Sequence, residues 1–340
     1  MSGRLSIKTI SELSGVSVAT VSRVMNQNGR FSLETERRVK DVIAKQGYVP
    51  SAVARGLRTK TLPIIGIIVP DIANEFFAKI VLEMQLLLFS RGYSVIICNT
   101  NESEELERMH LTTLGAQNVS GLVYISGGHR DEEFSSNVPA IYIDRHPEGE
   151  QAACSVLITS DNERGGYLAV NELIRCGCGR IALLIDKHGH SSRTERLNGY
   201  MRAIREHGLS ADNVIFAEVS SVGYQDAYEA MLQLWRGGRS FDGVACGTDW
   251  LAIGALAALR EMDVPVPGSV QVVGFDDITA AMIHAVPVTT IRQDTKAMAE
   301  VAVEQMMRLV AGQPTEQRHW FLPVELIRRA TTRARREADE

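Results

Sequence analysis

The hydrophobic positions of the first fifty residues repeat every three or four positions, which predicts three short helices. Two amphipathic runs are separated by Gly15; the first covers positions 7–13 and the second begins after Ser17, a good helix N-cap. A third run covers positions 32–46. Two helices joined by a short turn that contains glycine are typical of a helix-turn-helix unit. The three helices together predict a small core formed by Leu5, Leu13, Val21, Val24, Val39 and Ile43.

From position 64 the pattern changes to apolar runs that alternate with amphipathic helices. Continuous Val/Ile-rich strands separated by helices indicate parallel sheets covered on both faces. A first series has expected strands at 64–70, 94–99, 121–126 and 140–144, and helices at 75–91 and 104–117. A second series has expected strands at 156–161, 181–186, 214–219, 243–247 and 270–276, and helices at 162–176, 193–207, 223–236 and 249–262.

The last elements are expected to cross back between the two halves. They are a strand at 289–291, a helix at 294–311 and a strand at 320–328. The predicted fold is therefore an all-α helix-turn-helix head followed by an α/β core of two doubly wound parallel-sheet subdomains. The expected boundaries are 1–50 for the head, 51–62 for a hinge helix and linker, and 63–340 for the core, with an N-subdomain at 63–158 and 290–320 and a C-subdomain at 159–289 and 321–335.

The charge distribution separates the head from the core. Residues 1–60 carry 11 Lys and Arg against 4 Asp and Glu, although the whole chain has a net charge of −5. A basic head on an acidic body fits a phosphate-binding module whose body avoids DNA, although a merely solvated basic surface is the better explanation of the charge alone.

Cysteine usage and hydropathy bound the cellular setting. The five cysteines are odd in number and lie mostly in apolar strand-like runs, so reduced buried thiols in a cytosolic protein are expected. Cys176 and Cys178 have no second Cys or His pair at ligand spacing, and no metal site and no cofactor are expected. Neither a signal peptide nor a membrane-spanning run is recognised, which predicts a cytoplasmic protein associated with the nucleoid.

Motifs of common enzyme classes are missing from the strand ends. A dinucleotide site needs Gly-x-Gly-x-x-Gly after the first strand, where positions 70–75 read PDIANE. Neither a Gly-x-Ser-x-Gly elbow nor a Gly-x-x-x-x-Gly-Lys phosphate loop occurs. We therefore expect a protein that is not an enzyme.

Acidic and amide side chains follow most of the expected strands, at the edge where open α/β sheets bind ligands. These residues accept hydrogen bonds from hydroxyl groups, which favours a polyhydroxylated ligand. The alternative is that each residue only caps the following helix. Phe76 and Phe77 begin the next helix, where one ring is expected to stack on a sugar and the other to fill core. The strand-end residues are Asp71, Asn99, Asp144, Asp161, Asp186, Glu218, Asp249 and Asp276.

Five stretches in this order resemble the LacI family of transcription regulators: VSVATVSRVMN, SAVARGLRTK, IIGIIVPDIANEFFAKI, VVGFDDI and LPVELIRRATT. The resemblance covers essentially the whole chain. It implies a DNA-binding head, a hinge helix, and a core similar to periplasmic sugar-binding proteins. It also implies a homodimer on a near-palindromic operator, controlled by a small effector. The tail ATTRARREADE lacks the leucine heptads of tetrameric members.

The resemblance assigns roles to particular residues. On the second helix it implies base reading by Val18, Ala19 and Arg23, and Arg23 suits guanine because a guanidinium binds this base bidentately. Backbone contacts are implied for Ser17, Thr20 and Ser22. In the hinge, Leu57 matches the residue that wedges into the minor groove, and Ala54 belongs to the same DNA-binding set.

In the core, the resemblance implies that the effector touches residues from both halves. They are Phe76, Phe77, Asp144, Arg145, Asp161, Arg196, Glu218, Asp249 and Asp276, with Asp161 and Glu218 matching less closely. His190 and Ser192 replace the residues of purine-binding members, which favours a small neutral sugar. The expected function is therefore a repressor of carbohydrate-use genes; the alternative is a sugar-binding protein or sugar-acting enzyme with a vestigial head.

Overall fold

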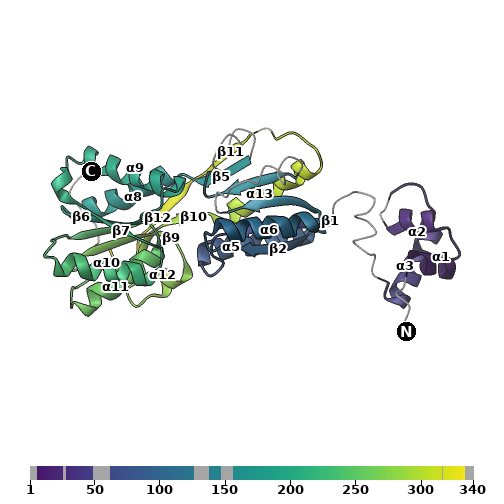
Figure 1. The fold of residues 1–340 in the computed structure, drawn as a ribbon, viewed down its shortest axis with the longest axis horizontal. Coiled ribbons are helices and arrows are strands. Elements are labelled where there is room, and N and C mark those ends of the chain that lie inside the picture. The colour runs from purple at the N-terminus through teal and green to yellow at the C-terminus, as the bar shows by residue number, and fades with distance from the viewer. Residues whose placement is uncertain are drawn as a thin grey trace. The chain divides into compact units, whose positions relative to one another are not determined.

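The structure is a computed structural model, which describes residues 6–25, 28–48, 62–125, 138–146, 156–315 and 317–333 (Figure 1). Two compact units are distinguished, Met1–Pro63 and Ile64–Glu340. The expected hinge at 51–58, with Ala54 and Leu57, lies outside the described residues.

The first unit contains the three expected helices, α1 (Ile7–Ser14), α2 (Val18–Met25) and α3 (Leu33–Gln46). Gly15 ends α1 in the left-handed conformation at φ 67°, which glycine adopts without strain. Ile10 takes the core position expected of Leu13, because the inward side of α1 carries Ile10 and Ser14 while Leu13 is 53% exposed. The fully buried apolar residues of this unit are Ile10, Val21, Val24 and Val39.

The first sheet of the core has the order β11-β5-β4-β3-β1-β2. Its strands are β1 (Leu62–Val69), β2 (Ser94–Asn99), β3 (Val119–Tyr124), β4 (Ala140–Ile143), β5 (Val156–Ser160) and β11 (His319–Leu322). Alternate strand residues point to opposite faces. Ile67 and Ile141 pack with α5 (Glu75–Ser90) and α13 (Thr295–Val310), whereas Ile68 and Tyr142 pack with α6 (Glu104–Ala116).

The second sheet has the order β12-β10-β9-β8-β6-β7. Its strands are β6 (Ile181–Asp186), β7 (Val214–Val219), β8 (Gly243–Cys246), β9 (Gln271–Asp276), β10 (Thr289–Gln293) and β12 (Val324–Ile327). Among the described ladders of this sheet, only the β10–β12 ladder is antiparallel. One face packs against α8 (Asn162–Arg175) and α9 (Ser191–Glu206) and the other against α10 (Tyr224–Arg236) and α11 (Asp249–Glu261), followed by the short α12 (Thr279–Ile283). The predicted pair of doubly wound subdomains is confirmed.

The chain crosses between the sheets three times, slightly later than expected. The strand β5 pairs with β4 and β11 through Ser160, so it belongs to the first sheet and not to the second series. The strand β10 stays in the second sheet through Gln293. The expected single strand at 320–328 is two strands, one in each sheet, separated at Pro323. Because proline has no N–H to donate, the strand ladder is interrupted at this residue.

Helices α8 and α9 approach each other closely at two glycines. A Cβ atom on Gly199 would overlap the carbonyl oxygen of Glu163, and one on Gly166 would overlap that of Arg196. Only glycine permits this contact between two backbones. The contact sets the position of the α9 turn that carries Arg196, a residue of the site described below.

Replacing Gly199 with alanine is therefore expected to force the two helices apart. Overpacking of this kind costs roughly 1–3 kcal/mol of the free energy of unfolding, which chemical denaturation measures. Gly179→Ala is the matched control, because a Cβ there would meet only a carboxylate oxygen of Asp242, at 4.0 Å. Equal effects of the two substitutions would show that the helices do not depend on this contact.

Candidate functional site

A cleft lies where the carboxyl ends of the strands of both core sheets face each other. Its inner chamber has a cavity volume of about 40 Å³, and its outer vestibule about 600 Å³. Since one water needs roughly 10–15 Å³ measured this way, the chamber holds a few waters and only the vestibule holds a larger molecule. The two spaces share Asn74, Phe77, Arg145, Asp186, His190 and Val222.

Three buried charged side chains meet at the centre of the chamber. Asp144 follows β4 of the first sheet, Asp276 ends β9 of the second, and Arg196 belongs to α9. The Nη2 atom of Arg196 lies 3.9 Å from Oδ1 of Asp144 and 3.9 Å from Oδ1 of Asp276. These separations exceed hydrogen-bond length, so an intervening polar group can bind all three side chains. The buried Oδ1 atom of Asp144 has no hydrogen-bond partner.

Arg196 is held in place by the second subdomain. Its Nε donates to Oδ1 of Asn162 at 2.9 Å, and its Nη1 donates to the carbonyl oxygen of Gly247 at 2.7 Å. The guanidinium also lies 3.8 Å from the ring centre of Phe275, a cation–π arrangement. Arg196 is therefore preorganised, with Nη2 directed toward the two carboxylates.

The environment of Asp276 favours its protonated form. Burial raises the pKa of Asp276 to about 7, from an ordinary value of 3.8, although the Arg196 guanidinium opposes the shift. The neighbouring Asp144 carboxylate adds to the increase in the pKa of Asp276. Gln293 donates through Nε2 to Oδ1 of Asp276 at 2.7 Å and fixes the carboxyl group.

This raised pKa predicts a pH dependence of stability. Between the unfolded pKa of 3.8 and the folded pKa of about 7, folded Asp276 holds a proton that the unfolded chain has lost. The contribution of Asp276 to the free energy of unfolding is therefore fully present below its unfolded pKa of 3.8. This contribution is lost as the pH rises toward 7, by at most about 1.4 kcal/mol per pH unit. Asp276→Asn cannot titrate, so its stability relative to wild type should rise with pH up to neutrality. If the difference in free energy of unfolding between Asp276→Asn and wild type stays constant from pH 4 to 8, the raised pKa of Asp276 is contradicted.

Arg145 connects the chamber to the mouth of the cleft. Both Nη1 and Nη2 of Arg145 donate to Oε1 of Glu102 at 3.1 Å. The neighbouring His190 and Arg145 side chains lower the pKa of Glu102 to about 2. Asn101 and Glu102 have φ angles of 49° and 59°, so the left-handed turn after β2 places Glu102 here. The sequence analysis did not select Glu102; its position just beyond a strand end was the available indication.

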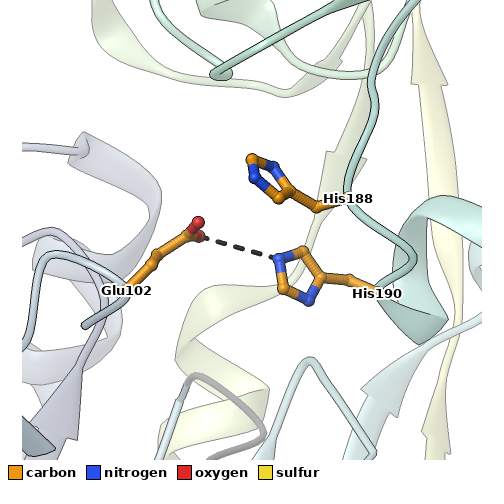
Figure 2. Close-up of side chains that lie close together, drawn as sticks. All are labelled: Glu102, His188 and His190. Atoms are coloured by element: carbon orange, nitrogen blue, oxygen red, sulfur yellow. Dashed lines mark ion pairs between the residues drawn. The ribbon is translucent and has the colours of Figure 1, made fainter. Parts of the chain in front are cut away.

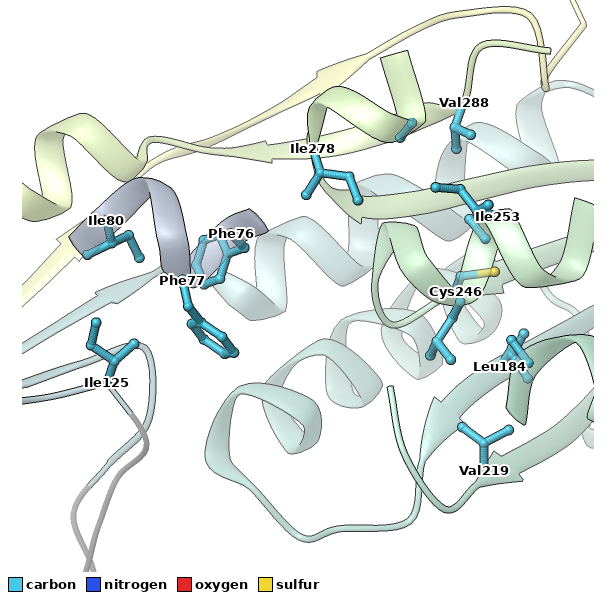
Figure 3. Packing of buried hydrophobic residues seen from close by; sticks show 14 of the residues in the cluster. Phe76, Phe77, Ile80, Ile125, Leu184, Val219, Cys246, Ile253, Ile278 and Val288 are labelled. Carbon is cyan, nitrogen blue, oxygen red and sulfur yellow. The ribbon is translucent and has the colours of Figure 1, made fainter. Parts of the chain in front are cut away.

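Both phenylalanines of α5 line the chamber, and both belong to the main core cluster (Figure 3). Their ring centres are 5.3 Å apart and the rings are tilted by 58°. Asn74 caps α5 by accepting from the N–H of Phe76 at 3.1 Å. Both rings therefore line the chamber and pack in the core, and stacking of one of them on a sugar stays a prediction.

Three expected site residues lie outside the cleft lining. Asp161 accepts from the N–H of Arg164 at 2.9 Å and caps α8. Asp249 is fully buried, and its carboxylate accepts bonds from Ile278 and Thr290 that tie α11 to α12 and β10. Glu218 pairs with Arg193 at 2.6 Å on the exposed side of β7. The alternative of helix capping is thus seen for Asp161, whereas Asp249 and Glu218 are bonded to other parts of the second subdomain.

The cleft lining also contains residues that the sequence analysis named without selecting them, and others that it missed. Asp186, His190 and Ser192 were named but not assigned to the site, and they line the chamber. Arg193 and Thr248 also line the chamber and were missed. All of these residues except Thr248 lie between the end of β6 and the first turn of α9, a stretch whose polar composition was the available indication in the sequence.

In the first unit, the beginning of α2 is exposed. Val18 is 39% exposed, and Ala19 and Arg23 are also exposed. The Oγ atom of Ser17 accepts from the N–H of Thr20 at 3.2 Å, so Ser17 caps the helix. Ser22 is half-buried on the same helix. This surface has the geometry of a recognition helix, whose N-terminal residues face base edges.

Comparison with known proteins agrees with both parts. The family described as "Bacterial regulatory proteins, lacI family" matches residues 6–51, and "Periplasmic binding protein-like domain" matches 170–332. The transcriptional regulator RegA of Clostridium saccharobutylicum is 33% identical, covering 96% of this chain and 99% of RegA. The ribose operon repressor of Halalkalibacterium halodurans is 30% identical, covering 96% and 97%.

Among solved structures, the lac repressor dimer bound to operator and the anti-inducer ONPF has a TM-score of 0.83 at 27% identity, covering 97% of this chain and 99% of that one. These relatives are named as regulators and repressors and not as enzymes. Within the described residues, no helix has the length and apolar character needed to cross a bilayer. The chain belongs to the LacI family of bacterial transcription regulators.

Proposed function

We propose that this regulator is a repressor of carbohydrate-use genes whose operator affinity is set by a small neutral sugar in the core cleft. The supporting observation is the unpartnered Oδ1 atom of Asp144, buried opposite Arg196 and Asp276 of the other subdomain. A ligand hydroxyl that donates to this oxygen joins the two halves. Charge-assisted hydrogen bonds of this kind are about twice as strong as neutral ones.

The rest of the lining also suits a sugar. Phe76 and Phe77 offer apolar ring surface for C–H groups, and Asp186 and Thr248 offer hydrogen-bonding atoms for hydroxyls. The vestibule has the volume for the ligand and adjoins the chamber, which the three charged side chains line. The relative named as a ribose operon repressor supports the same class of effector.

The cleft is proposed to communicate with the DNA through movement of the two core halves. A ligand that binds one arrangement of the halves more tightly shifts the population toward it. Three crossover segments link the halves, after Ser160, Gln293 and Leu322. A movement of the two halves relative to each other bends the chain at these crossover segments. The head is proposed to bind a near-palindromic operator through Ser17, Val18, Ala19, Thr20, Ser22 and Arg23, with Ala54 and Leu57 at the hinge. A regulator of this kind acts in the cytoplasm, at the nucleoid.

The proposed assembly is a homodimer, and α5 offers a surface for it. Leu82, Leu86 and Phe89 are 55%, 59% and 78% exposed, and Ile97 of neighbouring β2 is 42% exposed. Residues 82, 86 and 89 recur on one side of the helix, so they form a continuous apolar strip. A second copy of the same strip covers it with two-fold symmetry. Sedimentation equilibrium that returns the mass of a monomer at micromolar concentration would rule this assembly out.

A calorimetric panel tests the effector class. The full chain is titrated with ribose, galactose and cellobiose, and with hypoxanthine and glucose 6-phosphate as a nucleobase and a phosphorylated sugar. Binding of at least one neutral sugar, together with weaker binding to Asp144→Asn, is the expected result. Binding of hypoxanthine or the sugar phosphate alone would overturn the proposed effector class but leave the family assignment intact.

A further inference from the structure

Two histidines and a glutamate from opposite halves of the core meet at the mouth of the cleft (Figure 2). Glu102 comes from the loop between β2 and α6, and His188 and His190 come from the loop between β6 and α9. One potential ligand atom from each side chain lies within 4.8 Å of the other two. Glu102 is far from His188 and His190 in the sequence, so no local motif predicts the cluster.

The loops that carry these side chains are fixed by hydrogen bonds. The Asn99 side chain donates to Oδ1 of Asn101 at 2.6 Å beside Glu102. On the other side, the N–H of His188 donates to Oδ1 of Asp186 at 2.9 Å. The carbonyl oxygen of His190 accepts the first backbone bond of α9. The cluster is therefore preorganised from both subdomains.

The nitrogen of His190 that faces Glu102 is paired with it by charge only, without a hydrogen bond (Figure 2). Its Nε2 atom is buried, makes no hydrogen bond, and lies 3.8 Å from Oε1 of Glu102. This distance is too long for a hydrogen bond. It is close to the separation of roughly 3.3–3.6 Å between two ligands that each lie about 2.0–2.1 Å from one metal ion. A small approach of the two loops therefore suffices for both atoms to bind the same cation.

His188 has a carboxylate beside one of its ring nitrogens. Its Nδ1 atom lies 3.7 Å from Oδ1 of Asp186, within ion-pair distance but beyond hydrogen-bond length. Metal-binding histidines commonly donate their other ring N–H to a carboxylate, and a small shift of His188 brings Asp186 into this role. The ring centres of His188 and His190 are 5.7 Å apart and the rings are tilted by 28°.

The surrounding charge favours a divalent cation. Among the described residues, the vestibule is lined by the carboxylates of Asp71, Glu102 and Asp186 and by one guanidinium, that of Arg145. Arg145 donates two hydrogen bonds to Oε1 of Glu102, which fixes the oxygen that faces His190. The three carboxylates exceed the one guanidinium, and a dication bound here balances the excess negative charge.

We propose that Glu102, His188 and His190 form a zinc site that joins the two subdomains across the mouth of the cleft. Two imidazoles and one carboxylate are a common donor set for Zn²⁺, with a fourth position open to water or to a ligand hydroxyl. Because its donors come from both halves, the ion draws the halves together. Binding of Zn²⁺ itself does not depend on the proposed function; only its consequence for operator affinity does.

The test is calorimetric titration of the full chain with ZnCl₂ after treatment with EDTA. One Zn²⁺ per chain is expected to bind, and His188→Ala, His190→Ala and Glu102→Gln should each weaken binding at least tenfold. His207→Ala is the matched control, because His207 is an exposed histidine away from the cleft, bonded to Asn171. Binding that is absent, or equally strong in the His188 and His190 variants, overturns the site.

A structural readout separates a bridging ion from surface binding. Hydrogen exchange should slow in both loops, 99–103 and 186–191, when Zn²⁺ is added to wild type but not to His190→Ala. Protection in only one loop, or X-ray absorption that shows sulfur donors, contradicts a bridge across the cleft. Neither readout uses DNA or sugar, so failure of the zinc site and failure of the proposed repressor function remain distinguishable.

Discussion

Replacing Arg23 with alanine is expected to remove most of the discrimination between the operator and random DNA. Arg23 is exposed on α2, where a guanidinium reaches guanine in the major groove. Each lost bidentate contact costs roughly 1–3 kcal/mol, and a dimer loses two. Specific affinity should therefore fall by about 30-fold to more than 10,000-fold. Random DNA should lose much less, because phosphate contacts supply that affinity.

The measurement is fluorescence anisotropy with an operator selected from random DNA by the full chain. Arg37→Ala is the control, because it removes an exposed positive charge from α3 of the same head. This control should lower specific and random binding by similar factors. If Arg23→Ala behaves in the same way as Arg37→Ala, Arg23 contacts phosphate and the base-reading assignment is wrong.

Replacing Asp144 with asparagine is expected to weaken sugar binding by roughly 10–150-fold, the equivalent of about 1.5–3 kcal/mol for a hydrogen bond to a charged group. Asparagine keeps the volume of the side chain and removes its charge. Oδ1 of Asp144 has no hydrogen-bond partner in the folded chain, but its charge pairs with Arg196 at 3.9 Å, so thermal denaturation of the variant accompanies the titration. Operator binding without sugar should stay unchanged. Arg196 is a poorer test, because its bonds to Asn162 and Gly247 are structural.

Asp161→Asn is the matched control for this prediction. Asp161 also follows a strand of the first sheet, but its carboxylate caps α8 and lies outside the cleft lining. Asparagine caps helices about as well as aspartate does, so both stability and sugar affinity should change little. Calorimetry and thermal denaturation measure the two quantities. Equal losses of sugar affinity in both variants would place the ligand away from Asp144.

Hydrophobic periodicity was sufficient to predict the elements of the fold. The expected strand at 181–186 and the expected helix at 249–262 agree with β6 and α11 to within one residue. Long apolar runs specify such elements locally. The assignment of strands to sheets depends on pairing between distant segments, which periodicity does not contain. For this reason β5 was placed in the wrong series, and the crossover at Pro323 was missed.

The site was predicted only in part, for a related reason. Position at a strand end selected Asp144 and Asp276, which line the chamber, and their contact with an effector stays a prediction. The same rule also selected Asp249, which is satisfied by Ile278 and Thr290. Which role a carboxylate takes depends on donors that only the folded chain brings near. Glu102 reaches the cleft through a left-handed turn, which the sequence does not show.

The central claim is that a ligand in the cleft controls DNA binding, and one titration tests it most directly. Operator affinity of the full chain is measured with and without a saturating concentration of the neutral sugar that binds best in calorimetry, for wild type and Asp144→Asn. Wild type should change its operator affinity by roughly 5–150-fold, since coupling between sites is typically about 1–3 kcal/mol. Asp144→Asn should need a sugar concentration roughly 10–150-fold higher than wild type for half of the same change, in line with its weaker sugar binding. A wild-type protein that binds the sugar and keeps the same operator affinity would contradict the account.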